Sequence, residues 1–193
     1  MSKGRTGTLA VVLMATLPLA IAARVQTPAA GQALVKSMSR EDVAKTLTAA
    51  TWAGTPSREE GAAIFEKACA SCHLFGDLGK SVGPDLSTLA SRFKKSDIID
   101  AVLFPSKTIS DQYQMTMVEL NDGTIHSGLV FREDANYLYL KNADYLDRPL
   151  PLKLTDIKQR LEATTSLMPE NLVNEYSLQQ FDSLVAYMLA GPK

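Results

Sequence analysis

The sequence predicts an α+β protein that is mainly α-helical, with a small antiparallel β subdomain inserted into the helical domain. Apolar residues recur with helical spacing in residues 57–70 and in residues 177–190, near opposite ends of the 193-residue chain. In residues 112–161, apolar and polar residues alternate between turn signals, as in short strands. We therefore expect the helical domain over residues 57–111 and 162–193, and the β subdomain over residues 112–161.

The first 23 residues have the form of a signal peptide. Lys3 and Arg5 precede an apolar run over residues 9–23 that ends in small residues suited to cleavage. The run has about 15 residues, whereas a membrane-spanning helix needs about 20. We expect export to the periplasm and cleavage near Ala22 or Ala23, with a retained N-terminal membrane anchor as the alternative. No segment of the mature chain reads as a membrane span.

The charge balance argues against nucleic acid as a partner. The chain has 20 Lys and Arg against 21 Asp and Glu, a net charge of −1. Removal of residues 1–23 takes away two basic residues and no acidic one, which makes the net charge −3. Such a chain lacks the basic surface that binds phosphate backbones.

Residues 24–56 are expected to form a linker and an extra N-terminal helix. Residues 24–38 are rich in alanine, glutamine and small polar residues, which predicts a mobile linker. A helix is expected to start at Ser39, because an acidic residue follows three positions later. Trp52 would anchor this helix on the outside of the helical domain.

Two further helices are expected to cross. Ser57 and Glu60 form a capping box that opens a helix over residues 58–70. Gly61 lies inside it, where glycine costs about 1 kcal/mol relative to alanine, so it marks close approach by another helix. The expected partner is the C-terminal helix, which follows a second capping box and carries an apolar stripe (Phe181, Leu184, Val185 and Met188).

Cys69-Ala70-Ser71-Cys72-His73 follows the first of these helices. Two cysteines separated by two residues and followed by histidine are the attachment motif of c-type haem, in which each thiol forms a covalent link and the imidazole binds iron. Cys69 and Cys72 are the only cysteines in the chain. The motif predicts one covalently bound haem c per chain, and the signal peptide supports it because such haem is attached outside the bacterial cytoplasm.

Three other interpretations of the cysteines remain. A thioredoxin-like redox pair would follow a strand and open a helix, whereas this motif ends a helix. A structural zinc site needs four ligands and would have to recruit carboxylates, since His126 is the only other histidine. A disulfide between Cys69 and Cys72 is geometrically awkward across so short a loop.

The residues after the motif predict a histidine partner and another helix. In Gly83-Pro84-Asp85-Leu86, the Pro84 carbonyl could accept the His73 Nδ1 proton and leave Nε2 for iron. An ordinary turn is the alternative. Ser96 is expected to cap a short amphipathic helix that ends before Pro105.

Five short antiparallel strands are expected next. The alternation covers residues 113–120, 124–132, 137–141, 149–154 and 157–161. Asn121-Asp122-Gly123 forms the turn of the first hairpin. We expect a small curled sheet or barrel.

Met168 is expected to be the second axial ligand of the iron. The methionines of the mature chain are Met38, Met115, Met117, Met168 and Met188. Met188 lies in the apolar stripe of the last helix, and Met115 and Met117 alternate on a strand. Met168 lies in an irregular Ser-Leu-Met-Pro segment that could face the iron, or it could be a hydrophobic plug under a loop. His126 is interpreted as a surface residue.

These features together resemble a class I c-type cytochrome. More narrowly, the sequence resembles the PVC-type haem-binding Cys-x-x-Cys-His domain family over about residues 58–189. The motifs that carry this resemblance are Gly83-Pro84-Asp85-Leu86, Pro105-Ser106-Lys107, Ile109-Ser110-x-x-Tyr113, Asp122-Gly123-x-x-x-x-Gly128 and Ser166-Leu167-Met168-Pro169. The resemblance implies a cytochrome c fold, thioether attachment at Cys69 and Cys72, and axial ligation by His73 and Met168. It also accounts for the β segment between the two axial ligands.

The resemblance implies a periplasmic one-electron carrier rather than an enzyme. No acid–base pair or activated nucleophile lies near the motif in the sequence. We expect a redox protein partner: a dehydrogenase, an oxidase or another cytochrome. The β subdomain would dock on a dehydrogenase, or it is a passive insertion. The alternative function is a haem-based gas sensor or small peroxidase-like enzyme in which Met168 is displaceable.

Overall fold

The structure is a computed structural model that describes Met1, residues 30–142 and residues 144–192. The expected signal peptide lies outside the described residues except for Met1, and so do residues 24–29 of the expected linker. Among the helices in the described part, none is both long enough and apolar enough to cross a membrane.

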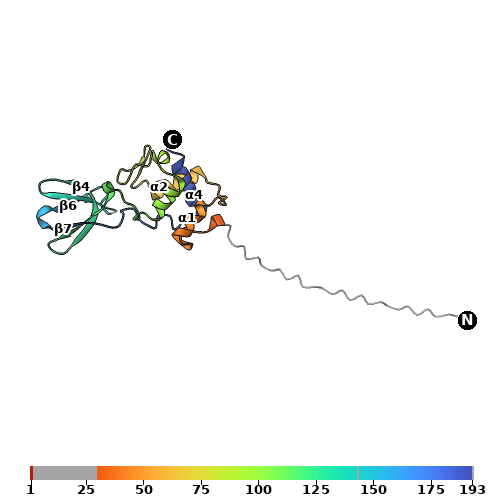
Figure 1. The fold of residues 1–193 in the computed structure, drawn as a ribbon, viewed down its shortest axis with the longest axis horizontal. Helices are drawn as coiled ribbons and strands as arrows, with labels where there is room; N and C mark the ends of the chain where they lie inside the picture. Colours follow the sequence, from red (N-terminus) through yellow and green to blue (C-terminus); the bar gives the residue numbers. More distant parts are fainter. Residues whose placement is uncertain (2–29, 143, 193) are drawn as a thin grey trace.

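The described residues form a mixed α+β protein, as the sequence predicts. The α-helices are α1 (Arg40–Thr48), α2 (Arg58–Ala68), α3 (Lys95–Leu103) and α4 (Leu178–Leu189). Short 3-10 helices occupy Ala30–Gln32, Val35–Ser37, Leu89–Ser91, Asp111–Tyr113 and Leu154–Asp156. Figure 1 shows the α-helices gathered on one side of the molecule and the longer strands on the other.

Residues 30–38 are not the mobile linker that the sequence predicts. Val35 is 2% exposed and belongs to the core of the helical part. Its N–H donates to the Tyr176 carbonyl at 2.9 Å, and the Leu178 N–H donates to the Ala33 carbonyl at 2.9 Å. This segment is therefore fixed against the start of α4. Its composition could not indicate this, because the partners lie about 140 residues away in the chain.

The predicted extra helix is present as α1. The Ser39 hydroxyl accepts from the Asp42 N–H at 3.1 Å, which confirms the predicted start. Val43 and Leu47 are buried in the helical core. The helix ends at Thr48, so Trp52 follows it rather than belonging to it.

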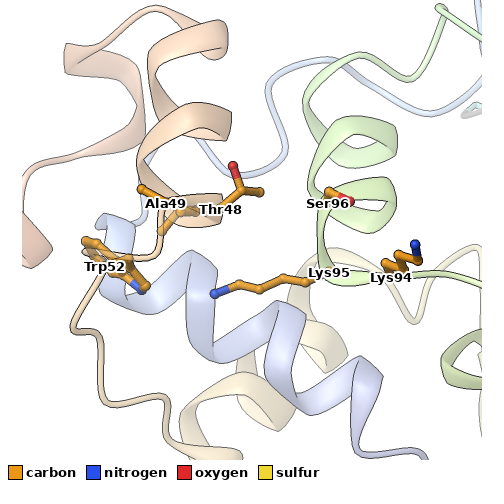
Figure 2. Close-up of a pocket in the computed structure, with 7 residues that line it drawn as sticks. Thr48, Ala49, Trp52, Lys94, Lys95 and Ser96 are labelled. Atoms are coloured by element: carbon orange, nitrogen blue, oxygen red, sulfur yellow. The ribbon is translucent and has the colours of Figure 1, made fainter.

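Trp52 contacts a buried carboxylate of α4. Its Nε1–H donates to Asp182 Oδ2 at 2.8 Å, and Asp182 is only 2% exposed. Lys95 Nζ lies 2.6 Å from Asp182 Oδ1 and forms an ion pair with it. Figure 2 shows the Lys95 side chain extending from α3 over α4 toward Trp52. Both residues line a pocket of about 340 Å³. Asp182 thus joins three segments, and loss of either partner would leave a buried charge poorly compensated.

The two predicted capping boxes differ in form. At α4, Ser177 and Gln180 exchange both hydrogen bonds, as expected. At α2, the Ser57 hydroxyl accepts from the Glu60 N–H at 3.2 Å, but the Ser57 N–H donates to Ser183 Oγ of α4 at 3.1 Å. Ser183 Oγ also lies 3.0 Å from Glu60 Oε2, so α4 completes the cap of α2.

α2 and α4 cross at Gly61, as the sequence predicts. A Cβ atom at this position would overlap the Ser183 carbonyl oxygen and lie 2.6 Å from Tyr187 Cβ. Gly61 is buried, and Phe65, one turn later, is fully buried. Only glycine lets the two backbones approach this closely.

α3 begins two residues earlier than a Ser96 cap would place it. Its N-cap is Lys94, and the Lys94 N–H donates to Asp97 Oδ2 at 2.9 Å. A carboxylate is a stronger hydrogen-bond acceptor than a hydroxyl and is favoured at the positive N-terminal end of a helix. Asp97 lies in this first turn and accepts the Lys94 N–H. The predicted end before Pro105 is confirmed.

The five predicted strands are present within one or a few residues. They are β3 (Thr116–Leu120), β4 (Ile125–Glu133), β5 (Tyr137–Lys141), β6 (Leu150–Lys153) and β7 (Ile157–Glu162). All pairs are antiparallel, and the order across the sheet is β6-β5-β4-β3-β7. No ladder joins β6 to β7 in the part of the chain that is described, so these strands are edges and the sheet is not a closed barrel. Gly123, with φ +86°, makes the predicted β3–β4 turn.

The sheet and the helices bury separate apolar clusters. Val118, Leu138, Leu140 and Leu152 form the buried cluster of the sheet. A larger cluster joins all four named helices with the residues around the Cys-x-x-Cys-His motif. The strands fall between α3 and α4 in the chain, so the helical cluster draws on residues from both sides of the sheet.

Candidate haem site

The Cys69–His73 motif forms one compact turn at the end of α2. Cys69 is the C-cap of the helix, and its N–H donates to the Phe65 carbonyl at 2.8 Å. The Cys69 carbonyl then accepts from the N–H groups of Cys72 and His73, both at 3.0 Å. The turn therefore holds both thiols and the imidazole on one short, hydrogen-bonded segment.

The chain after the motif folds back onto it. A small hairpin that the sequence did not predict, β1 (Leu74–Phe75) with β2 (Leu78–Gly79), leads away from His73. The Cys72 carbonyl then accepts from the N–H groups of Val82 and Gly83, at 3.0 and 2.7 Å. These bonds bring the Gly83-Pro84 segment against the histidine.

His73 is held by the backbone of Pro84. Its Nδ1 lies 2.8 Å from the Pro84 carbonyl oxygen. A carbonyl only accepts, so Nδ1 carries the proton and the Nε2 lone pair is left for a ligand. Burial lowers the pKa of His73, and the hydrogen bond to Pro84 opposes this shift more weakly. A neutral imidazole with a free Nε2 is the form that binds iron.

Gly83 lies directly against the imidazole ring. A Cβ atom there would be 2.7 Å from His73 Cε1 and 3.0 Å from Nδ1. The next residues tie this loop down further, because Asp85 accepts from the N–H and hydroxyl of Ser87, and Ser87 Oγ accepts from the Gly76 N–H at 2.8 Å. These hydrogen bonds lower the pKa of the exposed Asp85 carboxyl.

Cys69 and Cys72 are free thiols. Burial raises the pKa of the Cys69 thiol to about 12, and the neighbouring Cys72 thiol adds to the shift. A redox-active dithiol needs a low-pKa attacking thiolate, so this environment argues against the thioredoxin-like interpretation. Within the described residues, no group of three or more His, Cys, Asp and Glu side chains is placed to hold a metal ion, which argues against zinc.

The methionine candidates lie in different environments. Met188 is 2% exposed in the middle of α4, and Met115 is 8% exposed just before β3. Met117 lies within β3, and Met38 packs beside the helical core. Met168 is half-buried and packs against the same helical core from an irregular segment. His126 is half-buried in β4, opposite Val118 of the sheet.

Two serines hold the segment that carries Met168. The Ser166 N–H donates to Ser106 Oγ at 3.1 Å, and the Met168 N–H donates to Ser166 Oγ at 3.1 Å. Both serines lie inside sequence motifs, Pro105-Ser106-Lys107 and Ser166-Leu167-Met168-Pro169, but nothing in the sequence pairs residues 60 positions apart. An exposed ion pair also joins the β2 end of the motif loop to the β5–β6 loop, with Lys80 Nζ 2.7 Å from Asp147 Oδ1.

Comparison with protein families agrees with this geometry. Residues 58–123 match the family model described as Cytochrome c. The match supports a c-type cytochrome. It begins at the first residue of α2 and ends in the β3–β4 turn, so it includes Cys69, Cys72, His73 and Pro84 but not Met168. A search of curated proteins found no match to the chain.

A cytochrome c domain binds haem c covalently and serves electron transfer. The residues of this site fit a covalently bound haem. The motif offers two thiols and one neutral imidazole nitrogen. Leu78, Leu86 and Leu89 are partly buried and pack against the helical core, as do Cys69 and Met168. An apolar porphyrin would contact such side chains.

Gly83→Ala should disturb His73 without removing the attachment thiols. The added methyl group would push the imidazole from its hydrogen bond with Pro84, so we expect the ferric spectrum to change from one low-spin form to a mixture of spin states. Electron paramagnetic resonance of the haem-bound protein measures this.

Pro84→Ala is the matched control for Gly83→Ala. It keeps the accepting carbonyl and should keep the low-spin spectrum. A Gly83→Ala protein with an unchanged spectrum would contradict the close contact between Gly83 and the ring.

Proposed function

We propose that this chain is an exported mono-haem cytochrome of the class I, PVC-type family that carries one electron at a time between redox proteins. The observation that carries the proposal is the neutral His73, held by Pro84 at 2.8 Å beside two free thiols on one turn. The haem, when bound, supplies the ferric–ferrous couple. Cys69 and Cys72 retain it covalently, and His73 Nε2 is one axial ligand.

Met168 is the second axial ligand in this proposal. Its half-buried side chain packs against the same helical core as Cys69, and its segment is tied to the chain that follows α3. A thioether ligand favours ferrous iron more than a second imidazole would, and so raises the reduction potential. Two firmly held axial ligands also leave no open position for a substrate, which suits an electron carrier rather than an enzyme.

The location and partners follow from the same chemistry. Only two cysteines are present, enough for one haem per chain. Covalent haem and the signal-peptide-like start support a periplasmic protein. The partner is then another redox protein there: a dehydrogenase, an oxidase or a second cytochrome.

Optical spectra of the wild-type protein and Met168→Ala test this function. The protein is produced with its own leader in a host that attaches haem c. We expect haem that stays bound after denaturation, a low-spin reduced spectrum and, because the thioether must first leave the iron, only slow binding of carbon monoxide. Met168→Ala should bind carbon monoxide, because the sixth position of its iron becomes open.

Two results would overturn the proposal. An open sixth position already in the wild type, with carbon monoxide binding as fast as in Met168→Ala, would favour a gas sensor or a small peroxidase-like enzyme with a displaceable Met168. Absence of covalent haem would return Cys69 and Cys72 to thiol chemistry.

A further inference from the structure

The segment that carries Met168 is hydrogen-bonded to the chain between α3 and β3. At its start, the Ala163 N–H donates to the Met115 carbonyl at 2.8 Å, and the Gln114 side-chain amide donates to the Ala163 carbonyl. Farther along, it is held by Ser106. Residues 163–168 are therefore fixed at two points on the same stretch, residues 106–115.

The second attachment point consists of two serine hydroxyls in series. Ser106 Oγ accepts the Ser166 N–H, and Ser166 Oγ accepts the Met168 N–H, each at 3.1 Å and each partly buried. The first bond spans 60 positions of sequence, so it fixes where the segment lies. The second spans two positions and fixes the backbone of Met168 relative to Ser166.

The start of this segment borders an open pocket rather than a packed interior. The pocket has a volume of about 410 Å³ and is lined by Ser106, Ile109, Gln114, Glu162, Ala163 and Thr164. Thr164 and Thr165 are exposed. The course of the backbone up to Met168 is therefore set by hydrogen bonds rather than by a close-packed core.

We infer that Ser106 and Ser166 are positioning residues that hold Met168 for axial ligation and limit how often the thioether leaves the iron. This inference rests on the proposed function, in which Met168 is the second ligand. The serines act through the backbone of Met168 and do not touch the iron.

Removal of either hydroxyl should favour the open form by about tenfold. A tenfold change in this equilibrium corresponds to about 1.4 kcal/mol, which lies within the range for a partly buried N–H that loses its acceptor. Carbon monoxide enters only when the thioether is off the iron, so its association rate should rise by about the same factor. The weak far-red absorption band of thioether-bound ferric haem should lose intensity.

The experiment measures carbon monoxide association and the far-red band in the full-length haem protein. Ser166→Ala and Ser106→Ala should both show the increase, and Ser166→Thr, which keeps the hydroxyl, should restore wild-type values. Ser91→Ala is the matched control, because Ser91 makes one local hydrogen bond to the Thr88 carbonyl on another loop. It should leave both readouts unchanged.

The outcomes separate this inference from the function on which it rests. If Met168→Ala has wild-type spectra, Met168 is not the ligand, and both proposals fail. If Met168→Ala opens the iron while Ser106→Ala and Ser166→Ala behave like Ser91→Ala, only the inference fails. Should Ser166→Ala give no folded protein, Ser106→Ala decides, because it removes the long-range bond and leaves the Ser166 hydroxyl in place.

Discussion

In the haem-free, full-length chain, Cys69 should react with iodoacetamide at about one thousandth of the rate of an ordinary thiol near neutral pH. The reactive species is the thiolate. Burial and the adjacent Cys72 raise the pKa of Cys69 to about 12 from an ordinary value of 9.0, so the thiolate fraction falls by about three powers of ten. Mass spectrometry of the peptide that contains the motif, sampled over time, measures the rate.

The same chain in denaturant is the control for this prediction. There the Cys69 thiol should regain the ordinary rate, because its pKa shift depends on the folded turn. Equal rates with and without denaturant would contradict the burial of Cys69. A Cys69 that reacts faster in the folded chain would favour a redox dithiol instead.

The raised pKa of the Cys69 thiol also determines how the stability of the haem-free chain changes with pH. The folded haem-free chain keeps this proton up to about pH 12, whereas the unfolded chain loses it near pH 9.0. Between these values the folded state binds more protons, so its stability should fall as the pH rises. Haem attachment removes this dependence, since a thioether sulfur carries no proton.

Local signals explain which parts of the fold were predictable from the sequence. The starts of α1, α2 and α4 follow from serine caps within the helix sequence itself, and the strands follow from alternation of period two. The predicted cap of α3 at Ser96 was wrong, because a capping group inside the first turn of the helix competes with it. The carboxylate of Asp97 decides it by bonding to the Lys94 N–H.

Long-range contacts explain what could not be predicted. Residues 30–38 resemble a linker in composition, yet they pair with the chain before α4. By contrast, the Cys-x-x-Cys-His motif and Pro84 lie within 16 residues of each other in the chain, and local chemistry was enough to predict the hydrogen bond between His73 and the Pro84 carbonyl. The serines that hold the Met168 segment lie 60 residues apart, and only the folded chain brings them together.

Gly61→Ala should destabilise the protein by about 2 kcal/mol or more, although helix propensity alone predicts the opposite sign. In an isolated helix, alanine would be about 1 kcal/mol more favourable than glycine. Here the new Cβ would overlap the Ser183 carbonyl oxygen, a backbone atom that cannot rotate away. α2 and α4 would have to separate, and overpacking of this kind typically costs about 1–3 kcal/mol. The free energy of unfolding of the haem-bound protein, from guanidinium denaturation followed by circular dichroism, measures the effect.

Ala63→Gly in the same helix provides the matched control. Ala63 is exposed, so this change tests helix propensity without the crossing contact and should cost about 1 kcal/mol. If Gly61→Ala instead stabilises the protein by a similar amount, propensity governs both positions and the close crossing of α2 and α4 is wrong. If both variants destabilise it, with Gly61→Ala the larger loss, the contact between the helices outweighs propensity.

Because Cys69 caps the C-terminal end of α2, separation of α2 from α4 should also shift the Cys-x-x-Cys-His turn. Gly61→Ala should therefore lower the yield of haem-bound protein in the periplasm more than Ala63→Gly does.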